Sequence, residues 1–246
     1  MVWVRLVQPL PGTSLGPRTQ EGAVVKKIDL KKELKHLYAP SARKAEVVEV
    51  PDLRFVMVDG YMEPRETPPA SAAFQNAIAA LYGLSFALKF MSKQRKTNPI
   101  DYGVTALECL WWVDAGGFDF QAKDRWRWTL MMMQPKHITE SMFRTALRKL
   151  REEKDSPTLA KIRFDTFREG VAIQIMHVGP YAEEPGTMAL LKAFAQANGY
   201  RYRGKHHEIY LGDPRRAKPE KLRTILRQPV EKAPAPAKAP VRARRR

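Results

Sequence analysis

The sequence predicts a mixed α+β fold in which antiparallel sheets pack against helices. Strand patterns and helix patterns follow one another without the strict alternation that is typical of a parallel sheet. Several strand patterns are separated only by short turn sequences, as neighbours in an antiparallel sheet are. A short internal repeat also links the two halves of the chain. Together these three observations indicate the fold class.

The first half predicts one long helix among strands. A lysine-rich amphipathic segment at the start of residues 26–50 predicts at most a short helix, which Pro40 ends. Ser71 is a suitable N-cap for the long helix. The spans predicted from there are a strand at 54–60, a helix at 72–93, and two paired strands at 104–113 and 125–134.

The second half predicts further helices and strands. Thr139 is a suitable N-cap for a helix, and Glu169-Gly170 is a suitable turn between two paired strands. The predicted spans are helices at 140–153, 186–198 and 219–227, and strands at 161–168, 170–178 and 206–212.

The internal repeat suggests a cleft between two similar halves. Residues 58–64 (VDGYMEP) and 178–185 (VGPYAEEP) each lead into a helix, and the strand after each helix carries a carboxylate among aromatic residues. Those carboxylates are Glu108 and Glu208. We expect two related halves, with one carboxylate from each facing the cleft between them.

Composition indicates a globular protein. The chain has 246 residues, of which 44% are hydrophobic and 28% charged, so it is not disordered throughout. No apolar run reaches the ~18 residues that span a bilayer. The single cysteine, Cys109, indicates a reducing compartment, and we expect the cytoplasm. The expected organisation is a flexible extension at 1–25, one domain at 26–230, and a disordered basic Pro/Ala tail at 231–246.

The chain is strongly basic. It contains 43 Lys and Arg against 26 Asp and Glu, which gives a formal charge of +17. Nucleic acid or a membrane surface is the first explanation for such a balance. The tail at 231–246 could make weak, nonspecific contact with nucleic acid, or it could only keep the protein in solution. No membrane partner is expected, and the oligomeric state is left open.

Two aromatic strands could line a pocket. Alternate residues of a strand share a face, so Glu108 and Trp112 lie on one face and Cys109 and Trp111 on the other. Trp126 and Trp128 share a face of the partner strand, with Met132 further along it. An acid among tryptophans suits a flat or cationic ligand. An ordinary sheet core, with Glu108 paired to an arginine, fits equally well.

The run His206-His207-Glu208 places the first and third residue on one face of a strand. A metal site that also used His177 is disfavoured, because no set of ligands has the spacing of a zinc site. We expect no cofactor. Glu208 beside Tyr210 is the better candidate, as a cation binder or as a general base on water.

The aromatic stripe of the long helix, Tyr82, Phe86 and Phe90, could be core or the wall of a ligand site.

The joint spacing of seven runs resembles the stand-alone members of the GyrI-like small-molecule-binding family. The resemblance covers roughly residues 26–230, and neither the segment before Lys26 nor the basic tail belongs to it. The runs are DLKKELKHLYAPSA, FQNAIAALYGLSFALKFM, LECLWWVD, WRWTLMMMQP, MHVGPYAEEP, NGYRYRGKHHEIYLGDPRR and PEKLRTILRQPV.

The resemblance implies two β-α-β-β repeats about a pseudo-twofold axis, an SHS2-type arrangement with a ligand cleft between them. It also implies binding of aromatic, often cationic compounds. Some stand-alone relatives hydrolyse cyclopropanoid DNA-alkylating toxins, which suggests detoxification. The family's binding acid matches Glu208, with Tyr181 as a second catalytic candidate. The other expected ligand-binding residues are Tyr102, Glu108, Trp111, Trp112, Trp126, Trp128, Met132, His177 and Tyr210.

Two further functions stay open from sequence. One is a non-enzymatic DNA- or gyrase-associated binding protein, which the basic charge favours. The other is a ligand sensor that acts through a partner protein.

Overall fold

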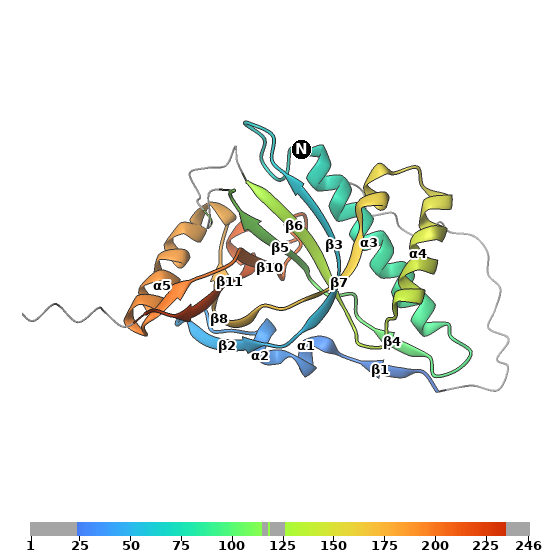
Figure 1. The fold of residues 1–246 in the computed structure, drawn as a ribbon, viewed down its shortest axis with the longest axis horizontal. Helices are drawn as coiled ribbons and strands as arrows, with labels where there is room; N and C mark the ends of the chain where they lie inside the picture. The colour runs from blue at the N-terminus through green and yellow to red at the C-terminus, as the bar shows by residue number, and fades with distance from the viewer. Residues whose placement is uncertain (1–23, 115–117, 119–125, 235–246) are drawn as a thin grey trace, which may run out of the picture.

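The protein forms a curled antiparallel sheet that carries helices on both faces (Figure 1). The structure, a computed structural model, describes residues 24–114, 118 and 126–234. Its helices are α1 (Leu30–Glu33), α2 (Lys35–Tyr38), α3 (Ala72–Lys93), α4 (Glu140–Glu153) and α5 (Glu184–Ala197), with short 3-10 turns at Pro157–Lys161, Tyr181–Glu183 and Pro219–Lys221. Its strands are β1 (Lys26–Ile28), β2 (Glu46–Val50), β3 (Leu53–Tyr61), β4 (Ile100–Tyr102), β5 (Leu107–Trp112), β6 (Arg127–Gln134), β7 (Arg163–Phe167), β8 (Gly170–Val178), β9 (Tyr200–Tyr202), β10 (His206–Tyr210) and β11 (Arg223–Lys232).

Two β-α-β-β units make up most of the sheet, as expected. The first is β3-α3-β5-β6 and the second is β8-α5-β10-β11. Along the sheet the strand order is β2-β8-β11-β10-β5-β6-β3-β7, so the units meet at the antiparallel pair β5 and β10. At the centre of this pair Glu208 lies opposite Cys109. The order of strands on either side of that point is mirrored, which is the pattern of a pseudo-twofold axis.

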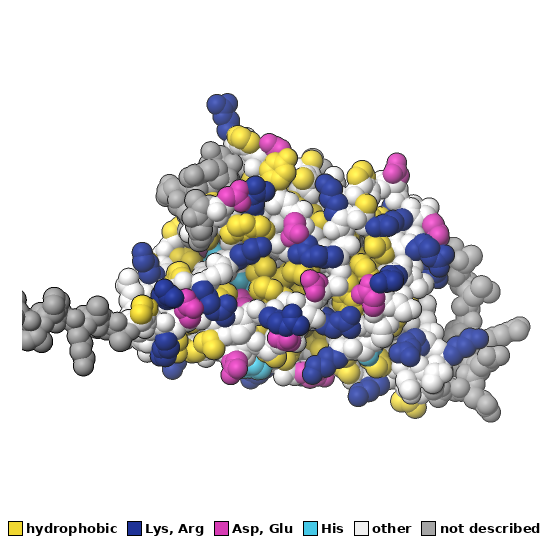
Figure 2. Space-filling view, viewed as in Figure 1, with side chains coloured by type: hydrophobic (Ala, Val, Ile, Leu, Met, Phe, Trp, Pro, Cys, Tyr) yellow, Lys and Arg dark blue, Asp and Glu magenta, His cyan; other side chains and the backbone are white. Residues whose placement is uncertain are grey.

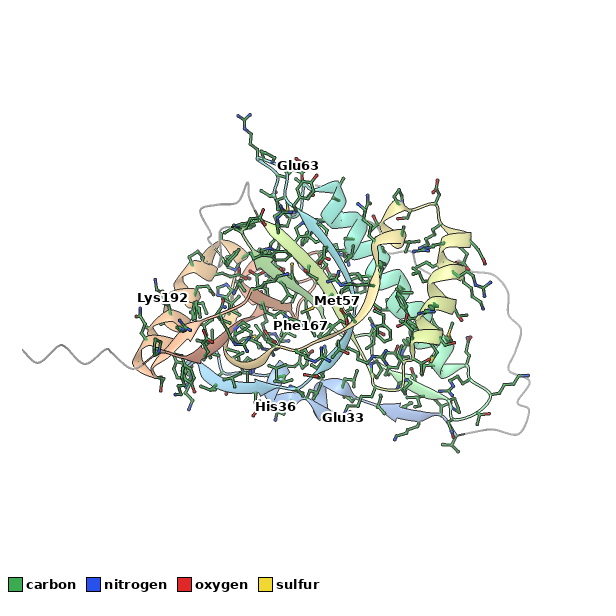
Figure 3. The ribbon with its side chains drawn as sticks, viewed as in Figure 1. Glu33, His36, Met57, Glu63, Phe167 and Lys192 are labelled. Atoms are coloured by element: carbon green, nitrogen blue, oxygen red, sulfur yellow. The ribbon has the colours of Figure 1, made fainter. Side chains whose placement is uncertain are left out.

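The two faces of the sheet are covered differently. Helices α3 and α4 cover the first unit and α5 covers the second, all on one face, which we call the helix face. The short helices α1 and α2 cover the other face, which we call the concave face. Figure 3 shows side chains, among them Met57 and Phe167, filling the space between the strands and α1–α2. Residues on both faces are therefore buried.

Two helices begin and end at the predicted residues. Ser71 caps α3 by accepting a hydrogen bond from the Phe74 amide (3.4 Å), and Thr139 caps α4 by accepting one from the Met142 amide (3.2 Å). Each cap satisfies an amide that has no partner within the helix. No helix among the described residues combines the length and the apolar character that crossing a membrane requires.

The helix predicted at 219–227 is wrong. Only Pro219–Lys221 form a 3-10 turn, and the following residues form β11 at the centre of the sheet. Ile225 packs on the concave face and Leu226 on the helix face. A strand that is buried on both faces lacks the alternating pattern that identifies most strands. Strand β11 also continues to Lys232, two residues beyond the expected end of the domain.

The predicted hairpin at Glu169-Gly170 is also wrong. Strand β7 pairs with β3, whereas β8 pairs with β2 and β11. The link between them carries the chain from one end of the sheet almost to the other, which requires the sheet to curl. Gly170 has a φ of +68°, a left-handed conformation that glycine adopts without strain. Two further strands, β1 and β2, lie in the segment for which only a short helix was predicted.

Candidate functional site

The two central strands place their acids on opposite faces. Because Glu208 lies opposite Cys109, its side chain points to the helix face, with Trp111 and Tyr210. Glu108 directly precedes Cys109 on β5, so its side chain points to the opposite, concave face. The alternation predicted along β5 is confirmed, but the expectation of one carboxylate from each half in a single cleft is wrong.

A chain of hydrogen bonds fixes the Glu208 carboxylate. The Tyr210 hydroxyl donates to Glu208 Oε2 (2.7 Å), and Trp111 Nε1 donates to the Tyr210 hydroxyl (3.2 Å). The other oxygen, Oε1, lies 3.3 Å from His206 Nε2. Glu208 is only 6% exposed, so its charge sits in a poorly solvated environment. Such surroundings strengthen its interaction with any cation or proton nearby.

A second carboxyl group, from Glu184, belongs to the same cluster. Glu184 is the first residue of α5 and is 3% exposed. Burial, and then the negative charge of Glu208, raise its pKa to about 10, so it holds a proton at neutral pH. The two acids therefore share one negative charge and one proton. This is the division of roles that acid–base chemistry requires.

Two buried polar groups beside these acids form no hydrogen bond of normal geometry among the described residues. They are Glu184 Oε1 and the hydroxyl of Thr224, which lies on β11 opposite Tyr210 and is close enough to Glu184 to lower its pKa slightly against the larger effect of burial. Buried polar atoms are almost always hydrogen-bonded, to protein, to water or to a ligand. Glu184 and Thr224 thus add two polar groups to the cluster around Glu208.

Aromatic side chains from both units border the acids. The ring of Tyr181, which is 37% exposed, packs edge-on against Tyr210, with ring centres 5.9 Å apart. Burial raises the pKa of the Tyr181 hydroxyl, which keeps it a hydrogen-bond donor. Phe118 stacks on His206 (4.8 Å), and its ring centre lies 5.2 Å from that of Trp126. From the first unit, Tyr82 on α3 is close enough to Asp213 for that charge to raise its pKa, after the effect of burial.

Several predicted site residues lie in the core under α3 instead. Phe74 covers Trp111 and Trp128, which lie opposite each other on β5 and β6, stacking on the first (5.5 Å) and meeting the second edge-on (5.2 Å). Trp128, Met132 and Tyr102 are each at most 3% exposed. These three share the helix face with Glu208 but contribute to the packing beneath the helix.

His177 supports the site from the side. Its Nε2 lies 3.1 Å from the carbonyl oxygen of Pro180, which can only accept, so Nε2 carries a hydrogen. Its Nδ1 lies 2.8 Å from the Thr187 hydroxyl. His177 thus holds the turn that leads to Tyr181 and to the start of α5, and both of its nitrogens are occupied.

Glu108 and Trp112, also predicted as ligand contacts, lie on the concave face. Lys205 Nζ sits 3.3 Å from the centre of the Trp112 ring. Glu108 is fully buried and accepts hydrogen bonds from Tyr38 (2.7 Å) and from His207 Nε2 (2.9 Å). It therefore belongs to a network apart from Glu208.

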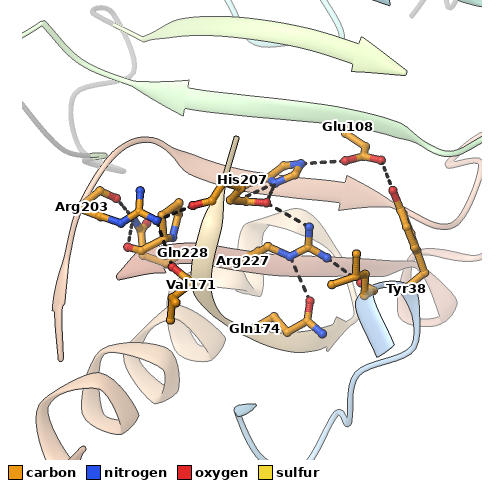
Figure 4. A network of polar contacts seen from close by, with 11 residues as sticks. Tyr38, Glu108, Val171, Gln174, Arg203, His207, Arg227 and Gln228 are labelled. Carbon is orange, nitrogen blue, oxygen red and sulfur yellow. Dashed lines mark hydrogen bonds and ion pairs between the residues drawn. The ribbon is translucent and has the colours of Figure 1, made fainter. Parts of the chain in front are cut away.

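That network is closed by two more charged residues (Figure 4). His207 Nδ1 lies 2.9 Å from Glu169, and Arg227 lies 3.2 Å from the same carboxylate. The two acids raise the pKa of His207 to about 9 against the effect of burial, and the two cations lower the pKa of Glu169 to about 2. Two negative and two positive groups thus balance. Arg227 also donates to Gln174 (3.0 Å) and to the carbonyl oxygen of Leu37 in α2 (2.6 Å).

Sequence reasoning missed Glu184. The signal was present in the repeat, where Glu183-Glu184-Pro185 opens a helix. Acids in the first turn of a helix are common because they interact favourably with the helix dipole, so nothing marked this one as buried.

Comparison with known proteins identifies the family. Residues 43–231 match the model of the GyrI-like small-molecule-binding domain. The chain belongs to the GyrI-like family. No match was found among curated proteins.

Three solved structures from Listeria innocua are similar to this GyrI-like chain. A conserved protein is 40% identical, with a TM-score of 0.74, and the alignment covers 83% of this chain and all of the other. Two structures described as hydrolases are 38% and 39% identical, with TM-scores of 0.71 and 0.73. They cover 83% and 84% of this chain, and each is covered completely.

Proposed function

We propose that the cluster around Glu208 binds a flat aromatic or cationic small molecule and hydrolyses it. The observation that carries this proposal is the buried pair of acids, Glu208 and Glu184, beside the rings of Tyr210 and Tyr181. The small-molecule-binding character of the family and the description of two similar Listeria structures as hydrolases add support.

The site suits the hydrolysis of a cyclopropanoid toxin, in which water opens a strained ring conjugated to a carbonyl. Glu208 takes a proton from the water, and the water oxygen bonds to a ring carbon. The ring C–C bond breaks, and its electron pair moves to the carbonyl oxygen. Tyr181 donates a hydrogen bond to this oxygen, and the proton held by Glu184 neutralises it. One water is added and the toxin loses its alkylating centre.

The aromatic residues bind and orient the substrate. Tyr181 offers an exposed ring that stacks on an aromatic ligand, with Tyr210, Trp111 and Trp126 packed behind it, and the negative charge of Glu208 attracts a cationic ligand. Stacked rings also keep bulk water from the strained ring, so that only a positioned water reacts.

Turnover of a cyclopropanoid alkylator, followed by the change in its ultraviolet absorbance, tests the proposal. We expect Glu208→Gln to reduce the rate at least ~100-fold, the usual contribution of a general base. The matched control is Glu183→Gln, which changes an exposed acid next to Glu184 and should leave the rate unchanged. Equal rates for the Glu208→Gln variant and the unmodified protein would contradict the assignment.

A further inference from the structure

Helix α3 carries an aromatic stripe on its outer side that neither the core nor the proposed site uses. Phe86 and Phe90 are 40% and 49% exposed. Their rings lie nearly parallel (26°), with centres 6.4 Å apart. Of the stripe predicted from sequence, only Tyr82 packs against the core. Two large exposed rings side by side are unusual on a surface unless they bind something.

Lysines share this side of the helix. Lys89 and Lys93 follow Phe86 by three and seven residues, a spacing that places all of them on one side of α3. Both lysines form ion pairs with Asp101 on β4, at 2.6 and 3.1 Å. Asp101 therefore holds both ammonium groups at β4, where Lys89 also donates to the carbonyl oxygen of Tyr102, and the three groups together leave a net positive charge.

More cations continue the surface beyond β4. Strand β1 pairs with β4, which places the exposed Lys27 opposite Asp101 and Lys26 one position away. The exposed Arg95 and Lys96 follow the end of α3. The charges of Arg95 and Lys26 both act on His137, where they lower its pKa after the effect of burial, so these cations share one corner.

These outer cations are not neutralised. Within the described part of the chain, no ion pair is formed by Lys26, Lys27, Arg95 or Lys96. Figure 2 shows Lys and Arg side chains at the corner over β1 and the loop into β4. On α4, by contrast, Arg144 pairs with Glu140 and Arg148 with Glu152. We call the first region the α3 surface: Phe86, Lys89, Phe90, Lys93, Arg95, Lys96, Lys26 and Lys27.

We propose that the α3 surface binds single-stranded nucleic acid. Exposed aromatic rings on which bases stack, bordered by cations that follow the phosphates, are the two features of sequence-tolerant single-strand binding. A second copy of the chain would fit less well, because it would bring two positive surfaces together. Duplex DNA hides the faces of its bases and would leave the rings unused.

Fluorescence anisotropy of the full chain with a labelled single strand of ~20 nucleotides tests this. The triple variant Lys26→Gln/Arg95→Gln/Lys96→Gln should bind more weakly. It loses up to three phosphate contacts, each of which contributes about 0.7 to the slope of log K against log salt, so that slope should fall by about 2. Phe86→Leu/Phe90→Leu should weaken binding at least ~5-fold and leave that slope unchanged. The control Arg144→Gln/Arg148→Gln should have little effect.

Three results would overturn the proposal. The first is unchanged affinity in both the glutamine and the leucine variants, with thermal midpoints that show folded protein. The second is loss of all binding on deletion of residues 235–246 alone, which would assign it to the basic tail. The third is equal or tighter binding of duplex DNA or of anionic vesicles, which do not offer exposed bases.

Discussion

The two faces of the central strands treat buried charge in different ways. On the concave face Glu108, His207, Glu169 and Arg227 form a balanced network in which each group contacts another. On the helix face a protonated Glu184 lies beside Glu208, and among the described residues Glu184 Oε1 and the Thr224 hydroxyl form no hydrogen bond of normal geometry. His207 and Glu208 are neighbours on β10, yet within the described part of the chain the concave network is the more completely paired of the two.

This contrast supports the proposal that the concave charges are structural and the helix-face acids functional. A fully paired network stabilises one arrangement and leaves nothing with which to bind a ligand. An incomplete cluster costs stability, and proteins keep such clusters where function requires them. The concave network therefore links the two units and holds α2 in place, whereas the helix-face cluster is the one for which we propose chemistry.

The largest expected effect is on the concave face. Arg227→Met leaves the Glu169 carboxylate with one cationic partner and removes the bond to α2, and we expect a loss of about 3–5 kcal/mol in the free energy of unfolding. Urea denaturation measures it. Arg223→Met, on the same strand but exposed, is the control and should change the value by less than ~0.5 kcal/mol. Equal values for both variants would remove the structural role of the network.

On the helix face we expect a substitution to raise the free energy of unfolding instead of lowering it. The pKa of Glu184 is raised from 4.5 to about 10, so folding becomes less favourable as pH rises above 4.5. Glutamine removes this cost, and Glu184→Gln should stabilise the protein at pH 7 by at most about 3 kcal/mol. The gain should disappear near pH 4. A destabilised Glu184→Gln variant in thermal unfolding at pH 7 would show that the site is satisfied.

The pH dependence of the concave network is the smallest effect. The pKa of His207 is raised from 6.5 to about 9, so its contribution is complete below pH 6.5 and is lost as pH rises through 9. Between pH 7 and pH 9 we expect a loss of about 2 kcal/mol. Measuring this loss in the Glu184→Gln variant removes the contribution of Glu184 and leaves that of His207. The loss should vanish in the double variant Glu184→Gln/His207→Gln. A loss that persists has another source.

Local signals in the sequence predicted some elements well. The caps at Ser71 and Thr139 predicted the starts of α3 and α4, and helical spacing of the apolar residues predicted their lengths, because those signals act within a few residues. The place of Glu208 near the junction of two repeats followed from the family resemblance and the repeat. Strand β11 was missed because it is buried on both faces and its apolar residues also fit a helical spacing.

The composition of each network could not be predicted in the same way. Whether Glu108 or Glu208 faced a given side depended on the register of β5 against β10, and a shift of one residue exchanges the faces. Glu169, Arg227 and Tyr38 meet only because the sheet curls and α2 folds beneath it. Glu184 became a candidate only once its burial beside Glu208 was known.

Ligand-induced thermal stabilisation of the full chain tests the central claim most directly, with the flat aromatic cation rhodamine 6G as the probe. Glu208→Gln changes the helix face, and Trp112→Phe changes the concave face. At 100 times the dissociation constant a ligand adds about 2.7 kcal/mol, a readily measured rise in Tm. We predict that the rise is lost in Glu208→Gln and kept in Trp112→Phe. A rise that survives Glu208→Gln and is lost in Trp112→Phe would place the ligand on the concave face and contradict the account.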